Sequence, residues 1–376
     1  MGFVFFWSWK NFRKNKSLIL CFVIISVAFS LVVCSLIVSK SMISGMEDRL
    51  VNLSSGHLLI YDSDDIQSEA EFSSYKVVNG FVMLYSKDGN CSVAVKGISD
   101  GYLEPREKYI TCIRQDVEGF KKIIISKNIS EKLLLSIGDK VAMLIVPDKS
   151  SKAVRPDIAV VSGIYDSGYA EIDDNLIYAD YDFAKRMFTD DSSVSTEIIL
   201  KNPSEKELYR IREKLGKYRS ATWMQLNFDV YENYVKSNQA VTLILFIVIL
   251  LSGYFTVSVS QQIVFDQKNN IGICRILGAD KKTMLKSVVL SVLTTVFAAE
   301  ITGLVLGLIC GCNICPIIKI LIKDKDVLKN YLLDFDIVIP YLSVAVMGIL
   351  QLAISFICIL IQLHGDFSHN DKLGII

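Results

Sequence analysis

The stretch SLILCFVIISVAFSLVVCSLIVS, residues Ser17–Ser39, decides the fold class of this chain. It contains no charged side chain. A helix over it would be roughly 34 Å long at about 1.5 Å per residue, which is enough to cross the hydrocarbon core of a bilayer. A basic run at 10–16 comes directly before it. Because an excess of Lys and Arg marks the cytoplasmic flank of a membrane helix, we expect a cytoplasmic N-terminus.

The flanks of this stretch favour a permanent helix over a cleaved signal peptide. The stretch is longer than the roughly 7–15 apolar residues of a signal peptide, and no clear small-x-small cleavage site follows it. Aromatic residues such as Trp7 and Trp9 stand beside the basic run. That combination favours the headgroup layer, so we expect a short interfacial helix on the cytoplasmic face before the first span.

Three further apolar stretches have the length of membrane spans: about Gln239–Ser260, Ser287–Cys310 and Ile337–Ile361. The loop between the first two of these is net basic and is expected in the cytoplasm. The next loop carries balanced charge and is expected outside. Four spans then return the C-terminus to the cytoplasm.

The charged residues, 21% of the chain, concentrate between about Glu47 and Lys236. Short β-rich runs occur there, with helical patterns at Tyr181–Phe188 and Ser204–Tyr218. We therefore predict an α-helical membrane protein with four transmembrane helices and a large α+β extracytoplasmic domain inserted between helices 1 and 2. The predicted segments are 1–40 for the interfacial helix and helix 1, 41–237 for the outer domain, and 238–376 for helices 2–4 with a cytoplasmic loop at 262–286.

Several function classes lack support in the sequence. The chain has 40 basic and 40 acidic residues and shows no basic patch for nucleic acid. It has no G-x-x-x-x-G-K-[S/T] motif, and so no P-loop for ATP hydrolysis. His57 stands apart from the other two histidines, which lie in the C-terminal tail, so a zinc or Ser-His-Asp site is poorly supported. We expect no catalysis, cofactor or metal in this chain.

Two groups of cysteines leave alternatives open. Cys310, Cys312 and Cys315 form a C-x-C-x-x-C pattern that suits a soft metal. No fourth ligand stands nearby, and thiols that only pack are the other interpretation. Cys91 and Cys112 fall in the expected outer domain, where a disulfide and two free thiols are both open.

The third apolar stretch carries a carboxylate and a glycine pattern. Glu300 is ionisable within an otherwise uncharged span, which makes it a functional candidate. A transport role and a helix–helix contact, with Thr302 sharing a hydrogen bond, are both open. Gly303, Gly307 and Gly311 recur every four residues. This small-xxx-small pattern predicts close packing against another helix, within the chain or across a dimer.

Several short segments carry a resemblance to a known family. They read MISGMEDRL at 42–50, VKGI at 95–98, LLSIGDKV at 134–141 and SGIYDSGYAEID at 162–173, and Trp223 comes shortly before the second span. With the order of one helix, a large outer domain and three helices, they resemble the MacB/FtsX-like permease superfamily. Within it, they are similar to the LolC/LolE-type lipoprotein-releasing permeases, along nearly the whole chain.

The segment KNNIGICRILGA, at 268–279, resembles the coupling helix of these permeases, which the resemblance implies docks on an ATPase subunit. A short helix with an apolar face suits a groove in a partner, and Gly278 suits the helix stop. The chain departs from the family at Asn270, where an acidic residue is usual, and in its C-terminal tail. The expected coupling residues are Asn270, Ile271, Ile273, Arg275, Ile276, Leu277 and Gly278.

The resemblance implies a permease subunit that extracts lipoproteins from the inner (cytoplasmic) membrane by mechanotransmission. ATP and Mg would be bound by a separate LolD-like ATPase, and a second permease subunit would complete a homo- or heterodimer. A lipoprotein client would enter an apolar cavity, and a hairpin would recruit a periplasmic chaperone. The cavity residues would be Val38, Met42, Ile43 and Met46, and the hairpin residues Pro147, Lys149, Lys152, Arg155 and Pro156.

Two other functions remain open at this point. The same fold serves MacB- or FtsX-like permeases in export or in the control of cell-wall hydrolases, and fold alone does not choose among them. A function of another class is a membrane-anchored binding or sensor domain without transport. The sequence leaves the LolC-like and LolE-like roles undivided.

Overall fold

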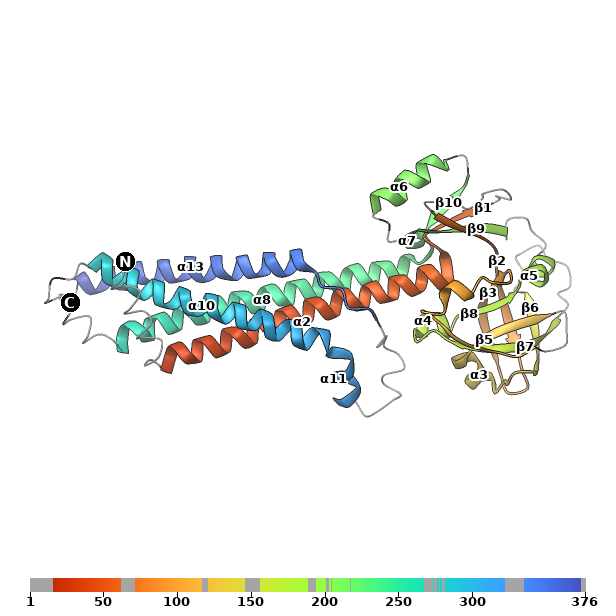
Figure 1. Ribbon diagram of the computed structural model, residues 1–376, viewed down its shortest axis with the longest axis horizontal. Coiled ribbons are helices and arrows are strands. Elements are labelled where there is room, and N and C mark those ends of the chain that lie inside the picture. Colours follow the sequence, from red (N-terminus) through yellow and green to blue (C-terminus); the bar gives the residue numbers. More distant parts are fainter. Residues whose placement is uncertain are drawn as a thin grey trace. The chain divides into compact units, whose positions relative to one another are not determined.

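The computed structural model describes residues 16–61, 72–116, 121–145, 156–188, 194–200, 203, 205–216, 218–266, 273, 276, 278, 281–321 and 335–372. The chain divides into two units (Figure 1). The helical unit comprises Met1–Ser41, Tyr234–Leu321 and Asp336–Ile376. The sheet unit comprises Met42–Asn233 and Ile322–Phe335.

Long apolar helices make up the helical unit. They are α2 (Lys16–Arg49), α8 (Phe228–Asp266), α10 (Lys281–Cys312) and α13 (Tyr341–Lys372), followed in length by α11 (Ile314–Leu321). Among the residues described, four stretches are long and apolar enough to cross a membrane: Lys16–Ser55, Phe228–Asp266, Lys286–Cys312 and Tyr341–Ile361. They contain the first three apolar stretches recognised in the sequence, whereas the helix of the fourth begins at Tyr341 and not at Ile337.

Apolar side chains lie both between these helices and on their outer surface. Leu18 and Ile25 of α2 are fully buried in one cluster with Val292 of α10. Leu31 and Leu251, in contrast, are more than half exposed. Exposed apolar side chains on long helices are expected where lipid replaces water around them.

The helices α2 and α8 extend well beyond the expected spans on the side of the sheet unit. α2 continues past Ser39 to Arg49 and then into a π-helical turn, η1 (Leu50–Ser55). α8 begins at Phe228 and not near Gln239. No proline interrupts either extension, so the helical hydrogen bonds continue beyond the apolar stretch. The predicted boundary near residue 40 thus falls within a continuous helix.

The sheet unit is built on ten strands. They are β1 (Leu58–Tyr61), β2 (Phe72–Tyr85), β3 (Asn90–Ile98), β4 (Thr111–Arg114), β5 (Lys122–Ser126), β6 (Lys140–Ile145), β7 (Asp157–Asp166), β8 (Leu176–Asp180), β9 (Val194–Leu200) and β10 (Ser220–Thr222). Their order is β10-β1-β9-β2-β3-β8-β5-β7-β4, and β6 pairs with both β2 and β7. The strands β2, β3, β8, β5, β7 and β6 therefore close into a ring.

Alternating side chains fill this ring. Val93 and Val95 of β3 and Ile123 and Ile125 of β5 are buried in one cluster, at the period of two that a strand imposes. Two helices, α3 (Lys127–Leu133) and α5 (Tyr181–Met187), contribute Leu133 and other side chains to the same core. Short β-rich runs thus form a mixed α+β unit with a core of its own.

A second, smaller core lies under the part of the sheet formed by β10, β1 and β9. Here α6 (Glu205–Lys214) packs Leu208 and Ile211 against Leu58 and Ile198. The helices α4 (Ala170–Asp173) and α7 (Trp223–Leu226) and the 3-10 turn η2 (Glu104–Arg106) complete the described elements of the unit. Cys91 and Cys112 are free thiols, so the disulfide alternative is not realised.

Candidate functional site

The C-terminal end of the first long helix lies within the sheet unit. The chain passes from α2 into η1, and Gly56 ends the turn with a φ of 67°. A helix leaves its last carbonyl groups without partners in its own backbone, and the end of its dipole is negative. The carbonyl oxygens of Asn52, Leu53 and Ser54 are in this position.

Two buried cations and a tyrosine donate to these carbonyls. Nζ of Lys96 lies 3.2 Å from the oxygen of Leu53 and 2.9 Å from that of Ser54. Nε of Arg106 donates to the oxygen of Asn52 at 2.7 Å. The hydroxyl of Tyr178 adds a bond of 3.0 Å to the oxygen of Leu53. Three consecutive carbonyls of the helix end are thereby bound.

A buried carboxylate balances the charge. Glu197 of β9 forms an ion pair of 2.5 Å with Lys96 of β3, and both side chains are 0% exposed. The other oxygen of Glu197 accepts from the Tyr102 hydroxyl at 2.7 Å. Burial lowers the pKa of Lys96 to about 8, while the charge of Glu197 opposes that change. We call Lys96, Tyr102, Arg106, Tyr178 and Glu197 the helix-end clamp.

Aromatic rings hold the arginine of the clamp. The Cζ atom of Arg106 lies 3.7 Å from the ring centroid of Tyr102 and 4.2 Å from that of Tyr75. Arg106 also donates to the backbone oxygen of Tyr102. Since a guanidinium ion between two rings keeps a fixed orientation, Nε is aimed at the helix end.

Further bonds fix the sides of the helix end. Nε of Arg49, the last residue of α2, donates to the oxygen of Ser167 at 2.8 Å. The Asp173 carboxylate accepts from the backbone N–H of Ser167 at 3.1 Å, and burial raises the pKa of Asp173 to about 6. Asn227, directly before α8, donates to the Ser55 hydroxyl at 3.2 Å. The segments after α2 and before α8 are thus joined within the sheet unit.

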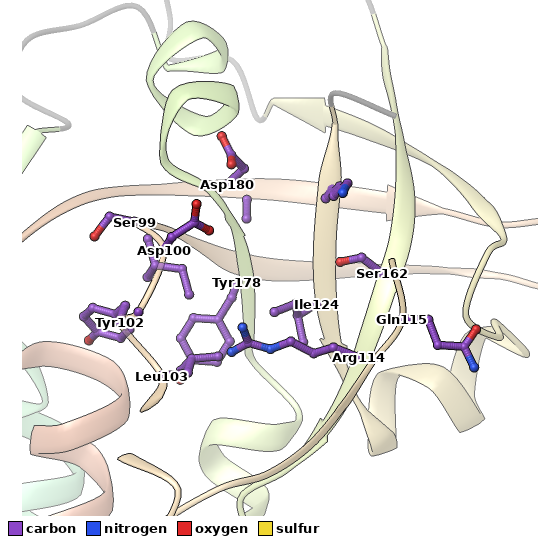
Figure 2. Close-up of a pocket in the computed structure, with 14 residues that line it drawn as sticks. Ser99, Asp100, Tyr102, Leu103, Arg114, Gln115, Ile124, Ser162, Tyr178 and Asp180 are labelled. Carbon is purple, nitrogen blue, oxygen red and sulfur yellow. The ribbon is translucent and has the colours of Figure 1, made fainter. Parts of the chain in front are cut away.

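A pocket of about 200 Å³ lies beside the clamp and shares two of its tyrosines. Figure 2 shows Arg114 pointing toward Leu103 and Tyr178. The pocket mixes apolar, acidic and basic side chains. It is lined by Ile98, Ser99, Asp100, Gly101, Tyr102, Leu103, Arg114, Gln115, Lys122, Ile124, Ser162, Tyr178, Ala179 and Asp180.

Part of the predicted coupling segment is described. Ile273 and Ile276 are helical and exposed, at 57% and 88%, and Gly278 has a φ of +92°. A φ in this region suits the predicted helix stop. Asn270, Ile271, Arg275 and Leu277 lie outside the described residues.

The other predicted sites are described in part. Val38, Met42, Ile43 and Met46 are half-buried side chains of α2. Pro156 is exposed immediately before β7. The remaining residues assigned to the hairpin, Pro147, Lys149, Lys152 and Arg155, lie outside the described residues.

The glycine pattern lies against α2. A Cβ atom at Gly303 would be 2.7 Å from the oxygen of Ser26, and one at Gly307 would be 2.7 Å from Cβ of Val33. At Gly311 the nearest atom, Cδ1 of Ile37, would be 2.9 Å away. These distances leave no room for a larger residue, so the two helices approach backbone to backbone.

Glu300 lies on the same helix as the glycine pattern, near Thr302. The Thr302 hydroxyl bonds with Ser26 at 3.0 Å and donates to the oxygen of Ala299 at 2.9 Å. Among the described residues Thr302 thus bonds with Ser26 and Ala299, and the hydrogen bond to Glu300 that the sequence left open is not formed. Oε1 of Glu300 is buried without a hydrogen-bond partner in the described part of the chain. Cys310, Cys312 and Cys315 form no disulfide, and no group of His, Cys, Asp and Glu suited to a metal occurs among the described residues.

The sequence did not reveal the clamp. Lys96 belongs to the VKGI segment that carries the family resemblance, but nothing marked its charge as buried. The one local signal is a lysine and a glutamate inside two apolar strand runs, VAVKGI at 93–98 and STEIIL at 195–200. Charges in such runs are seldom fully buried unless paired, and their pairing depends on the order of strands.

The helices after the sheet unit match a known family. Residues 242–364 match the FtsX-like permease C-terminal domain. The match covers most of the last three long helices, and with four helices long and apolar enough to cross a bilayer the chain is a membrane protein.

Two solved structures are similar to this chain over 48% of its length. The periplasmic region of MacB from Actinobacillus actinomycetemcomitans is 10% identical, with a TM-score of 0.29, over 48% of this chain and 94% of that chain. The extracellular domain of the ABC-type transporter YknZ from Gram-positive bacteria is 13% identical, with a TM-score of 0.25, over 48% of this chain and 87% of that chain. TM-scores this low do not establish a common fold. No curated protein matches the chain.

Proposed function

We propose that this chain is the membrane subunit of an ABC transporter of the MacB/FtsX-like permease superfamily. The observation that carries the proposal is the FtsX-like permease domain at 242–364, which begins within α8 and includes α10 and most of α13. The sequence contains no P-loop. ATP and Mg would therefore be bound by a partner ATPase, and this subunit would not itself be a catalyst.

The transporter would work by mechanotransmission. The ATPase dimerises on ATP and moves the coupling segment at 268–279, whose Ile273 and Ile276 present apolar side chains to a partner groove. The long helices α2 and α8 carry that motion to the sheet unit, into which both continue. Hydrolysis at one site is thereby coupled to a change of shape at another.

The finer assignment is lipoprotein release from the inner membrane, as in LolC/LolE-type permeases. The segments at 42–50, 95–98, 134–141 and 162–173 support it by resemblance. In this proposal a LolD-like ATPase, a second permease subunit, a lipoprotein client and a periplasmic chaperone are the partners. The half-buried Met42 and Met46 suit an adaptable apolar surface for acyl chains.

The test is co-purification of the full chain from native membranes, with mass spectrometry of bound proteins and lipids. We expect an ABC ATPase and acylated proteins, and we expect Ile273→Asp to lose the ATPase. Ile158→Asp is the matched control, because Ile158 is 58% exposed, against 57% for Ile273, but lies on β7 in the sheet unit.

Other results would select the other functions. An ATPase without acylated proteins would favour export or the control of cell-wall hydrolases. Absence of any ATPase would refute the transporter and leave a membrane-anchored binding or sensor domain. Equal loss of the ATPase in both isoleucine variants would remove the coupling role from Ile273.

A further inference from the structure

We propose that the helix-end clamp is the joint through which an axial displacement of α2 moves the sheet unit. The inference rests on the proposed function and identifies the residues that transmit the motion. It assigns a positioning role to Lys96, Arg106, Tyr178 and Glu197, none of which lies in a predicted site.

The bonds of the clamp meet α2 and η1 at the C-terminal end of the helical segment. Carbonyl groups of a helix point along its axis toward the C-terminus. Lys96, Arg106 and Tyr178 donate to the carbonyls of Asn52, Leu53 and Ser54 and so contact the helix at its end. Because α2 and η1 form one uninterrupted helical segment, a pull along the axis acts directly on these bonds.

The hydrogen bonds that Lys96 and Arg106 of the clamp donate are strong because these donors are charged and buried. Hydrogen bonds from a charged donor are about twice as strong as neutral ones, and they become stronger still where water is excluded. Lys96 and Glu197 are fully buried, and Arg106 is 2% exposed. A cation at the C-terminal end of a helix is also favoured by the helix dipole. The helix end is therefore unlike a surface cap, which water can replace.

Two of the donors, Lys96 and Tyr178, are anchored on adjacent strands of the ring. Lys96 of β3 and Tyr178 of β8 are direct partners in the parallel register of these strands. Both strands belong to the closed ring, and Glu197 belongs to β9, which pairs with β2 of that ring. A displacement received by Lys96 and Tyr178 thus reaches two adjacent ring strands together.

The test uses variants that separate transmission from folding. Tyr178→Phe removes only the hydroxyl that bonds with Leu53. Tyr165→Phe is the matched control, because Tyr165 is equally buried and its hydroxyl donates to Leu176, in β8, at 2.6 Å. The double variant Lys96→Met/Glu197→Gln removes the lysine bonds, leaves no unpaired buried charge from that pair and keeps an acceptor for Tyr102.

The full chain in nanodiscs is first studied without nucleotide by hydrogen exchange. We expect faster exchange at residues 50–57 in Tyr178→Phe, and faster still in the double variant, with little change there in Tyr165→Phe. Core strands β5 and β7 should exchange as in the unmodified chain. Unchanged exchange at 50–57 in the double variant would overturn the proposal, with or without an ATPase.

The second arm uses the chain with its co-purified ATPase, trapped with ATP and vanadate. We expect exchange in β3 and β8 to change on trapping in the unmodified chain and in Tyr165→Phe. The change should be reduced in Tyr178→Phe and lost in the double variant, while ATP hydrolysis continues. If exchange in β3 and β8 of the double variant changes on trapping as much as in the unmodified chain, the proposal that the clamp is the joint is wrong. Failure to recover any ATPase would instead overturn the proposed function.

Discussion

The two units of this chain hold their buried polar groups in different ways. In the sheet unit, the charged side chains of Lys96 and Glu197 are fully buried and paired with each other and with neighbouring groups, although Nη2 of Arg106 and Nε1 of Trp223 are buried without hydrogen-bond partners among the described residues. In the helical unit, Oε1 of Glu300 and Nε2 of Gln351 are buried without hydrogen-bond partners among the described residues, and glycines bring the helices together. Charge pairing therefore organises one unit and small-residue packing the other.

The largest expected effect compares one glutamate from each unit. Glu197→Gln leaves Lys96 buried without its counter-charge, and breaking a buried pair in this way typically destabilises by about 3–5 kcal/mol. Glu300→Gln removes a carboxylate that has no cation in contact within the described chain, so no comparable loss is expected. Chemical unfolding of the full chain in micelles, followed by hydrogen exchange in β3 and α10, measures both. Equal losses of unfolding free energy in Glu197→Gln and Glu300→Gln would contradict the difference between the two units.

The sheet unit should also respond to pH through two groups with opposite signs. The folded pKa of Asp173 is raised to about 6, so the folded state binds more protons than the unfolded state between about pH 4 and 6. Stability falls as pH rises through that window. Asp173→Asn removes this effect and should add up to about 3 kcal/mol at pH 7. The amide oxygen can still accept from Ser167.

His57 gives the opposite slope. Burial lowers its pKa to about 4, and its Nδ1 accepts from the backbone N–H of Leu200 at 3.2 Å. The unfolded state then binds more protons between about pH 4 and 6.5, so stability rises with pH. Between pH 4 and 7, the free energy of unfolding of the sheet unit in urea should rise with pH in Asp173→Asn. It should fall with pH in His57→Gln. The same slope in both variants would contradict the assignment of the two groups.

The contrast between the units also explains which features of the structure could be predicted from the sequence. The four apolar stretches were predictable because a charged side chain in lipid is costly. A membrane span is therefore visible in the sequence as a long stretch with few charged residues. The glycine pattern is local as well, since Gly303 and Gly307 stand one helical turn apart. The end of the first helical segment at Ser55 was not predictable, because its last carbonyls are bound by Lys96, Arg106 and Tyr178, which lie farther along the chain.

The clamp could not be predicted from local sequence patterns either, because its residues are distant from one another in the sequence. A lysine in a strand reads as an exposed charge until its partner is known. Lys96 and Glu197 lie on strands that are not neighbours in the sheet, and β2 lies between them. The pair can be recognised only after the strand order and the place of η1 are fixed. Local patterns thus predicted the class of each unit, whereas tertiary contacts determine the candidate site.

The smallest expected effect concerns packing in the helical unit. Gly307→Ala places a Cβ atom 2.7 Å from Cβ of Val33 and 2.9 Å from the oxygen of Ser30. Overpacking of this kind costs about 1–3 kcal/mol, and the better helix propensity of alanine offsets up to about 1 kcal/mol of that. A modest net loss is expected, with faster maleimide labelling of the buried Cys21 as the readout.

Leu306→Ala is the control, because Leu306 is adjacent but half exposed. It should leave the labelling of Cys21 unchanged, since it removes no contact between α10 and α2 at the glycine pattern. If Gly307→Ala also leaves the labelling unchanged, the close approach of α10 and α2 does not hold the unit together. Buried polar groups such as Glu300 and Gln351 would then have to contribute more, and the two units would differ less than their structures suggest.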